Sequence, residues 1–404
     1  MLAIIETHPI QYRAPVYRAL QRDFGVPVTV IYGSDFSLVG YRDREFGAMF
    51  AWDTDLLSGY ASVFLTRVGQ GGPRSAEHTS TRGLGPILRK LAPAAVLLVG
   101  YSPRFHQLAW WQAWRTGRPL LLRAETTDHA VRRSGSKVWL RDRALRLLYQ
   151  RCDRLLYVGR RSSEHFRRLG CPDDKLVFSP YCVDTTSFEP GEDARRTLRS
   201  STRERLGIVP DDKVLLLSGK LVRRKRPDLL LQAIKRLPQE LRQRIHVLAL
   251  GSGEQQAAFE SLARESPPVT VTCLGFQNQT RLSAYYHAAD LLVLPSDAGE
   301  TWGLVVNEAL HHGLPCVVSD AVGCAPDLIE SGATGEVFES GSAHSLASAL
   351  ERVWTLTDRV SVRDTCRRAV SGYTVAKAAE GIARAYAQVV APAELHAEAV
   401  MRGA

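Results

Sequence analysis

Short apolar runs alternate with helical stretches along almost the whole chain, and this alternation constrains the fold more than any other feature. In the first half the predicted strands are residues 3–6, 28–32, 95–99, 120–123 and 154–158. The predicted helices are residues 15–23, 84–90, 105–115, 138–151 and 161–169. Strands that alternate with helices indicate a parallel sheet wrapped by helices, which is a doubly wound α/β domain.

The second half repeats this pattern and predicts a second domain of the same kind. Its predicted strands are residues 213–218, 245–250, 270–274, 291–294, 316–319 and 335–337, and its predicted helices 227–236, 254–264, 281–288, 304–312 and 345–354. The predicted division is a first domain at 1–185, a polar linker at 186–206, a second domain at 207–372, and a helix and tail at 373–404. Ligands of such domains bind beyond the carboxyl ends of the strands, so the expected site is the cleft between the domains.

One segment of the second half, residues 295–327, combines two carboxylates with a helix start. Glu300 precedes the predicted helix, and Glu308 lies about a turn and a half inside it. Thr301 is at the expected N-cap position, and Gly303 lets a ligand approach the backbone. The free amides of a helix start favour an anion such as a diphosphate. Because carboxylates accept hydrogen bonds from neighbouring hydroxyls, one is expected to hold a sugar and the other a ribose.

The residues around this carboxylate pair carry a family resemblance. Residues 300–310 read ETWGLVVNEAL, and residues 313–323 read GLPCVVSDAVG. This signature resembles the donor site of the retaining glycosyltransferases of family 4, which have the two-domain GT-B fold. The resemblance implies two Rossmann-like domains facing each other across a cleft, with the last helix crossing back to the first domain. It implies a catalytic Glu300 and donor contacts from Thr301, Trp302, Gly303, Leu304 and Glu308.

The loop after the first strand of the second half carries a cluster of cations. Residues 218–228 read SGKLVRRKRPD. In the resemblance, Lys220 and Lys225 match the positions that hold the leaving diphosphate, and both lysines are expected to assist catalysis. Gly219 is an expected donor contact. The family usually has Arg at the position of Lys220. The guanidinium of Arg can donate two parallel hydrogen bonds to a phosphate, whereas the ammonium of Lys acts as a point charge. Phe276 lies in a segment that matches the family's contact with the nucleobase.

Two loops of the first half place polar residues at the carboxyl ends of predicted strands. One loop lacks the glycine-rich sequence of the family and is expected to bind the acceptor through His8, Gln11, Tyr12 and Arg13. The other carries Glu125, which is expected to hold donor or acceptor hydroxyls as a fourth catalytic residue. His129 is the alternative residue for contact with the acceptor and the reacting sugar.

The sequence also contains an Asp-x-Asp pair, Asp53 and Asp55, which in GT-A enzymes binds a metal ion together with the nucleotide sugar. The surrounding residues, WDTDLLSGY at 52–60, instead resemble a first-domain motif of the same GT-B subgroup. Seven cysteines without a CxxC pair suggest neither a disulfide framework nor a zinc site. We therefore expect no metal and no cofactor, with the diphosphate bound by helix amides and lysines.

The net charge of +10 is concentrated in the first half. Residues 1–185 hold 27 Lys and Arg against 16 Asp and Glu, whereas the rest holds 25 against 26. This excess either reflects only an Arg-rich composition or creates a positive electrostatic potential that favours anionic partners. Such partners are anionic lipid, a lipid-linked phosphate or nucleic acid. Residues 137–151 mix Trp139, Leu140, Leu147 and Leu148 with five cations. This helix is expected either to contact an anionic membrane or to pack its apolar side on the domain and expose its arginines.

These features predict a retaining glycosyltransferase that moves a sugar from a nucleotide diphosphate sugar to a small-molecule, glycan or lipid-linked acceptor. The resemblance implies same-face attack without a covalent nucleophile. One alternative is a GT-B nucleotide-sugar epimerase, which needs no acceptor. A remote alternative is a non-catalytic basic module, although no nucleic-acid motif is present and no nucleic-acid partner is expected. Because no signal segment or membrane-length apolar run is apparent, the protein is expected in the cytoplasm, either free or peripherally bound at the membrane.

Overall fold

The computed structural model describes residues 1–42, 49–50, 52–128, 135–297 and 299–402. Its first domain is built on a parallel seven-stranded sheet in the order β5-β2-β1-β6-β7-β8-β9. The strands are β1 (Leu2–Glu6), β2 (Val28–Tyr32), β5 (Ala61–Phe64), β6 (Ala95–Val99), β7 (Leu120–Ala124), β8 (Arg154–Tyr157) and β9 (Leu176–Phe178). The central strands β1, β2, β6 and β7 are fully buried, as their continuous apolar runs predict. The edge strands β5 and β9 were not predicted, because they are short and only partly buried.

Helices cover both faces of this sheet. They are α1 (Ala14–Phe24), α2 (Leu84–Leu91), α3 (Arg104–Trp114), α4 (Gly135–Gln150) and α5 (Arg160–Arg168), with a small hairpin of β3 (Tyr41–Arg42) and β4 (Met49–Phe50). One core layer joins the sheet to α1 and the C-terminal helix α15 (Val375–Arg402), and another joins it to α2, α3, α4 and α5. The first domain is therefore doubly wound.

The second domain has a parallel six-stranded sheet in the order β12-β11-β10-β13-β14-β15. Its strands are β10 (Lys213–Ser218), β11 (Ile245–Leu250), β12 (Thr270–Cys273), β13 (Leu291–Leu294), β14 (Cys316–Ser319) and β15 (Gly335–Phe338). Its helices are α6 (Glu192–Arg205), α7 (Pro227–Ile234), α8 (Gln239–Arg242), α9 (Gln256–Arg264), α10 (Leu282–Ala288), α11 (Leu304–His311), α12 (Ala325–Leu328), α13 (Ala343–Val353) and α14 (Val360–Val370). The strand order reverses between β10 and β13, which is where a doubly wound sheet opens a ligand crevice.

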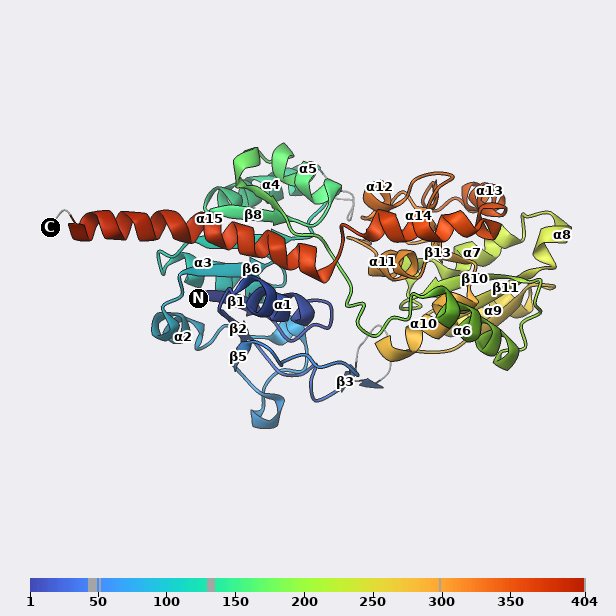
Figure 1. Ribbon diagram of the computed structural model, residues 1–404, viewed down its shortest axis with the longest axis horizontal. Helices are drawn as coiled ribbons and strands as arrows, with labels where there is room; N and C mark the ends of the chain where they lie inside the picture. The colour runs from blue at the N-terminus through green and yellow to red at the C-terminus, as the bar shows by residue number, and fades with distance from the viewer. Residues whose placement is uncertain (43–48, 51, 129–134, 298, 403–404) are drawn as a thin grey trace.

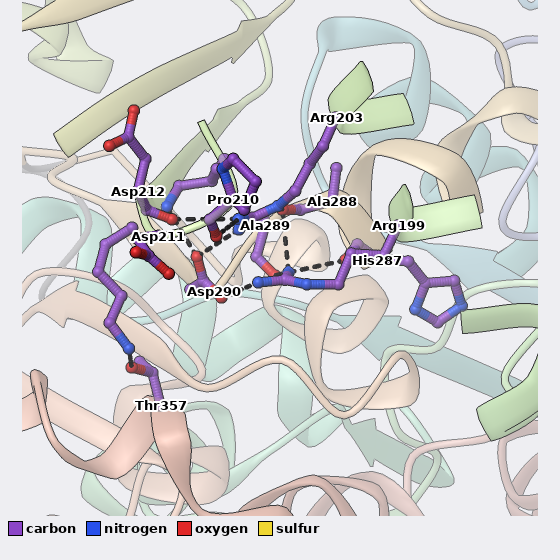
Figure 2. A network of polar contacts seen from close by, with 12 residues as sticks. Arg199, Arg203, Pro210, Asp211, Asp212, His287, Ala288, Ala289, Asp290 and Thr357 are labelled. Atoms are coloured by element: carbon purple, nitrogen blue, oxygen red, sulfur yellow. Dashed lines mark hydrogen bonds and ion pairs between the residues drawn. The ribbon is translucent and has the colours of Figure 1, made fainter. Parts of the chain in front are cut away.

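The segment predicted as the linker contains a helix, α6, that is fixed to the second domain. Arg199 and Arg203 each place an Nη2 atom 2.6 Å from a different carboxylate oxygen of Asp290. Arg199 also donates to the carbonyl oxygens of residues 287, 288 and 289 at the end of α10, each at 3.1 Å (Figure 2). The polar composition of α6 suggested a linker, but its arginines neutralise a buried carboxylate and bind orphaned helix carbonyls.

The C-terminal helix α15 crosses back to the first domain, as predicted. Figure 1 shows it running along the first domain beside α1, while α14 remains with the second domain. Ala378, Ala379, Ile382 and Ala385 of α15 are completely buried. Gly381 allows close approach, because a Cβ atom there would lie 2.1 Å from the carbonyl oxygen of Phe178. Within the described residues, no helix combines the length and apolar character needed to cross a membrane.

Candidate active site

The predicted cation loop and carboxylate loop meet at the crevice between β10 and β13. Lys225 Nζ contacts Glu300 Oε2, and Ser296 Oγ donates to the same oxygen at 3.0 Å. The side chains of Lys225 and Glu300 are only 14% and 11% exposed. Lys220 lies half-buried in the same loop, next to Gly219, whose φ of 119° requires glycine. The topology thus places a cation and a carboxylate 75 residues apart in direct contact.

The start of α11 differs in one respect from the prediction. The N-cap residue is Gly303, and no side chain caps the helix, so the prediction that Thr301 is the N-cap is wrong. A Cβ atom at Gly303 would lie 3.0 Å from Leu294 and from Val322, and its φ of 102° also favours glycine. The chain therefore enters α11 too abruptly for Thr301 to reach the first amides. Leu304 is the first residue of the helix, so the backbone amides there remain available to an anion.

Glu308 is buried inside α11, where it is 8% exposed. Tyr286 donates its hydroxyl proton to Glu308 Oε2 at 2.6 Å. Burial raises the pKa of Glu308 to about 7, against the lowering effects of Tyr286, Gln279 and Lys225. Its carboxyl group can therefore both donate and accept near neutral pH. It faces a cavity of about 180 Å³, here called the α11 cavity, which is lined by Gln11, Tyr12, Thr54, Val183, Asp184, Ser187, Gln279, Leu304, Val305 and Glu308.

The first-domain loop after β1 is divided between two cavities. Gln11 and Tyr12, which were predicted to bind the acceptor, line the α11 cavity. Arg13 lines a different cavity, and its Nη1 donates to both carboxylate oxygens of Glu6. His8 lines neither of these two cavities. Its ring lies 4.3 Å from that of Phe36, and burial, aided by Arg13, lowers its pKa to about 3.

The second cavity, here called the first-domain cavity, has a volume of about 300 Å³. It opens where the first sheet reverses its strand order, between the ends of β1 and β6. Its lining comprises Thr7, Ile10, Arg13, Val99, Gly100, Tyr101, Ser102, Pro103, His106, Glu125, Thr126, Thr127, Arg141 and Thr301. Glu125 Oε2 accepts hydrogen bonds from Tyr181 at 2.6 Å and, across the domain boundary, from Thr301 at 3.0 Å. Glu125 therefore joins this cavity to the start of α11, whereas His129 lies outside the described residues.

Trp302 belongs to the packing between the domains. It is 4% exposed, and its ring lies 5.9 Å from that of Tyr181 and 5.6 Å from that of Tyr373. Its Nε1 donates to Asn307 Oδ1 at 2.8 Å. Behind it, Gly159 has no room for a Cβ atom, which would lie 2.3 Å from the indole. These contacts hold the carboxylate loop against the first domain, so we leave Trp302 out of the proposed donor contacts.

The two carboxylates of the Asp-x-Asp pair accept hydrogen bonds from different parts of the chain. Asp53 accepts a hydrogen bond from Thr280 of the second domain at 2.7 Å. Asp55 accepts hydrogen bonds from the backbone amides of Leu57 and Ser58. The Ser58 side chain, together with these two amides, lowers the pKa of Asp55 to about 2. Next to Asp53 in the sequence, the ring of Trp52 lies 6.1 Å from that of Phe276. Asp53 thus bridges the domains and Asp55 stabilises a turn.

Several residues of the site gave no recognisable signal in the sequence. They are Tyr101, His106, Arg141, Tyr181, Gln279, Tyr286 and Ser296. Each reaches the site from an element whose local pattern indicates only a helix, strand or loop. Tyr286, for example, lies on the short helix α10 and is completely enclosed. Only the packing of α10 against α11 brings its hydroxyl to Glu308.

We expect the substitution Glu308→Gln to stabilise the protein at neutral and alkaline pH. An unfolded chain ionises this carboxyl group near pH 4.5, whereas the folded protein keeps its proton up to about pH 7. The free energy of unfolding therefore falls as the pH rises through this window and stays low above it. The substituted amide side chain carries no charge to bury, and the gain should be about 2–3 kcal/mol above pH 7.

Urea unfolding at pH 5 and pH 8 measures this effect, and the exposed Glu351→Gln is the control. The gain of the Glu308 variant should be larger at pH 8, with little change in the control. An equal effect of Glu308→Gln at both pH values would contradict a raised pKa.

The overall architecture matches solved two-domain glycosyltransferases. Sucrose-phosphate synthase from Thermosynechococcus elongatus superposes with a TM-score of 0.69 at 19% identity, covering 97% of this chain and 99% of that one. Anabaena HepE in complex with UDP and glucose gives a TM-score of 0.68 at 16% identity, covering 96% of this chain and 100% of that one. WaaG, a glycosyltransferase involved in lipopolysaccharide biosynthesis, gives a TM-score of 0.65 at 16% identity, covering 95% of this chain and 98% of that one. Two Rossmann-like domains with sites at their facing crevices thus define a protein of the GT-B class.

Family models identify the chain more closely. A model described as glycosyl transferases group 1 matches residues 199–390, and one described as a glycosyl transferase 4-like domain matches residues 9–182. The chain belongs to the group 1 glycosyltransferases. Among curated relatives, D-inositol 3-phosphate glycosyltransferase of Xylanimonas cellulosilytica is 36% identical over 183 residues, and that of Kineococcus radiotolerans is 31% identical over 229. These matches cover 42% and 52% of this chain but only 41% and 49% of the relatives, so the chain spans less than half the length of each.

Proposed function

We propose that this protein transfers a sugar from a nucleotide diphosphate sugar to an acceptor hydroxyl, with retention of configuration. The observation that carries this proposal is the arrangement around the start of α11. Glu300 precedes the helix in contact with Lys225, and Glu308 lies buried within it beside a cavity. Solved structures of the same fold contain UDP and glucose in HepE, and ADP and acarbose in starch synthase IV from Arabidopsis thaliana. A nucleoside diphosphate sugar is therefore the donor class we propose.

The donor would bind along α11. Its diphosphate would contact the free amides at the start of the helix together with Lys220 and Lys225. Its ribose would enter the α11 cavity and share its hydroxyls with Glu308. Phe276 would lie towards the nucleobase. Glu300 would turn from Lys225 to the hydroxyls of the transferred sugar as the lysine engages phosphate.

The chemistry would proceed through an oxocarbenium-like transition state. As the sugar departs, the diphosphate gains negative charge, which both lysines and the amides at Gly303 and Leu304 would stabilise without a metal. The acceptor hydroxyl would attack from the face that the diphosphate leaves, and a donor phosphate oxygen would take its proton. No covalent enzyme intermediate is required.

The acceptor would occupy the first-domain cavity. Glu125 lines this cavity together with Thr301, which donates to it at 3.0 Å and directly precedes the start of α11. Its carboxylate can accept a hydrogen bond from the attacking hydroxyl group and orient it. Arg141, whose Nη2 donates to the hydroxyl oxygen of Tyr101 at 3.3 Å, lines the same cavity and supplies further donors.

A thermal-shift screen with UDP-, GDP- and ADP-sugars tests the donor, because a ligand of the folded state raises its melting temperature. A positive donor is then incubated with and without candidate acceptors, and the products are analysed by mass spectrometry and by NMR of the anomeric proton. We expect one nucleotide sugar to stabilise the protein and transfer to require an acceptor. Conversion of the donor to an epimer without any acceptor, or stabilisation by no nucleotide sugar, would refute the proposal.

A further inference from the structure

Helix α4 buries Leu145 and Tyr149 in the core but turns other large apolar side chains towards solvent. Trp139, Leu140 and Leu147 are 61%, 66% and 60% exposed. The side chain of Arg141, by contrast, is only 15% exposed and forms ion pairs with Asp128 and Asp142. The sequence left open whether this helix packs its apolar side on the domain and exposes its arginines. The structure instead exposes Trp139, Leu140 and Leu147 and largely covers Arg141. The exposed apolar side chains therefore need another explanation.

Helix α3 continues the apolar surface next to α4. Its Leu108, Trp111 and Trp114 recur every three residues and are 40%, 48% and 42% exposed. Ten large apolar side chains are exposed among those that the structure describes, and six of them are on α3 and α4. Such a concentration is unusual for a soluble surface and marks an interaction site.

The two helices lie side by side. They are successive crossovers, β6 to β7 and β7 to β8, and both belong to the core layer on the same face of the sheet. Tyr101, just before α3, contacts Arg141 of α4 at one end. At the other end the guanidinium of Arg151 lies 5.5 Å from the ring of Trp114. The exposed sides of α3 and α4 therefore form one surface, here called the α3–α4 face.

The charged residues of this face are almost all cationic. Helix α3 has no acidic residue, and Asp142, the acidic residue of α4, is paired with Arg141 and Arg168. Exposed cations surround the apolar side chains: Lys137, Arg143, Arg146 and Arg151 on and after α4, and Arg115 and Arg118 after α3. A cavity of about 780 Å³ between α2 and α3 is lined by Arg89, Arg115 and Arg118 beside Trp111. Within the described part of the chain no acidic side chain pairs with these three arginines.

We propose that the α3–α4 face docks on a lipid bilayer that contains anionic lipids. Trp and Leu side chains enter the interface between headgroups and acyl chains, while the long Arg and Lys side chains reach the phosphates. The combination of exposed aromatics with exposed cations fits this partner better than a neutral protein surface, because an anionic bilayer offers apolar and anionic groups together over a flat area. Each cation near such a surface strengthens binding by about fivefold.

Because of where the first-domain cavity lies, this docking also bears on the class of acceptor. The inference about the acceptor rests on the proposed function. Tyr101, Ser102 and Pro103, immediately before α3, line the cavity together with Arg141 of α4. The cavity that contains Glu125 therefore adjoins the face that we place on the bilayer. An acceptor anchored in the membrane would reach Glu125 without leaving its lipid surroundings. The acceptor class we infer is thus a lipid-anchored hydroxyl compound.

Flotation of the full chain with vesicles tests the docking. Vesicles of phosphatidylcholine alone are compared with vesicles containing about one third phosphatidylglycerol, at low and high salt. We expect the protein to bind the anionic vesicles at least about tenfold more strongly, and high salt to weaken this binding. The variant Trp139→Ser/Leu140→Ser/Leu147→Ser should lose at least about tenfold in binding. Arg143→Gln/Arg146→Gln should lose a similar factor.

Val209→Ser is the matched control, since Val209 is 57% exposed but belongs to the second domain. Its vesicle binding should equal that of the wild type, and unchanged melting temperatures should show that all variants fold. Failure to bind anionic vesicles, or equal binding by the triple variant, would overturn the proposal. So would a dimer in light scattering that the triple variant dissociates, because the occupant would then be a second copy. Vesicle binding is measured without donor, so a failed nucleotide-sugar screen would refute the proposed transfer but leave the docking intact.

Discussion

Replacing Glu300 by alanine should lower kcat/KM for sugar transfer by about a thousandfold while nucleoside diphosphate binding persists. In the proposed reaction its carboxylate accepts charge-assisted hydrogen bonds from two sugar hydroxyls, and these strengthen as the oxocarbenium ion forms. Two such bonds contribute about 4 kcal/mol together, which corresponds to about 10³ in rate. Nucleotide affinity should hold or increase, because Lys225 then has no carboxylate to compete with the diphosphate.

The split between transfer and binding identifies the role of Glu300. The rate of transfer is measured from the nucleoside diphosphate that is released. Binding of the nucleoside diphosphate is measured by calorimetry. Glu300→Gln should retain part of the activity, since its amide oxygen still accepts one hydrogen bond. The exposed Glu351→Gln should behave as the wild type. Unimpaired transfer by Glu300→Ala, or a loss of nucleotide affinity as large as the loss of rate, would remove Glu300 from the proposed site.

Replacing Lys225 by alanine should impair both transfer and nucleotide binding. The lysine would neutralise charge that grows on the leaving diphosphate, and removing one such group costs about 10²–10³ in kcat. The same substitution leaves the carboxylate of Glu300, which is 11% exposed, with Ser296 at 3.0 Å and Arg224 at 4.0 Å. A largely covered carboxylate that keeps only this more distant cation should lower the free energy of unfolding by about 2 kcal/mol.

A double-mutant cycle separates the two effects of Lys225. Lys225→Ala/Glu300→Ala should unfold at a higher denaturant concentration than Lys225→Ala alone, because the carboxylate that lost its lysine partner is gone. Its transfer activity should be no better than that of either single variant. The exposed Lys235→Ala is the matched control for the loss of a cation. Additive stability effects of the two substitutions would show that the ion pair contributes nothing to the folded state.

The fold was predictable because its evidence is local. A buried strand needs only a few consecutive apolar residues, and a helix only apolar residues at its own period, so the central strands and most helices lie within a few residues of their predicted positions. The helix start at Gly303 and its pair of carboxylates are likewise encoded within ten residues. Elements without a clear local signal, such as the edge strand β9 and the polar helix α6, were missed.

The arrangement of the candidate site was decided by contacts between distant parts of the chain. Thr301 looked like a helix cap, but its hydroxyl bonds Glu125, which is 176 residues away in the sequence. Gln11 and Tyr12 belong to the same loop as Arg13, yet they line a different cavity. No window of sequence contains this information, because it depends on how two sheets and the returning helix α15 set the domains against each other.

The sequence by itself therefore determined two doubly wound domains, a cation loop, and a helix start flanked by acidic residues. Only the tertiary structure decided that Lys225 faces Glu300, that Trp302 joins the domains, and that α4 exposes three large apolar side chains. The physical reason is the range of the forces involved. Backbone hydrogen bonding and apolar periodicity act between neighbours along the chain, whereas ion pairing and burial depend on which distant side chains the topology brings together.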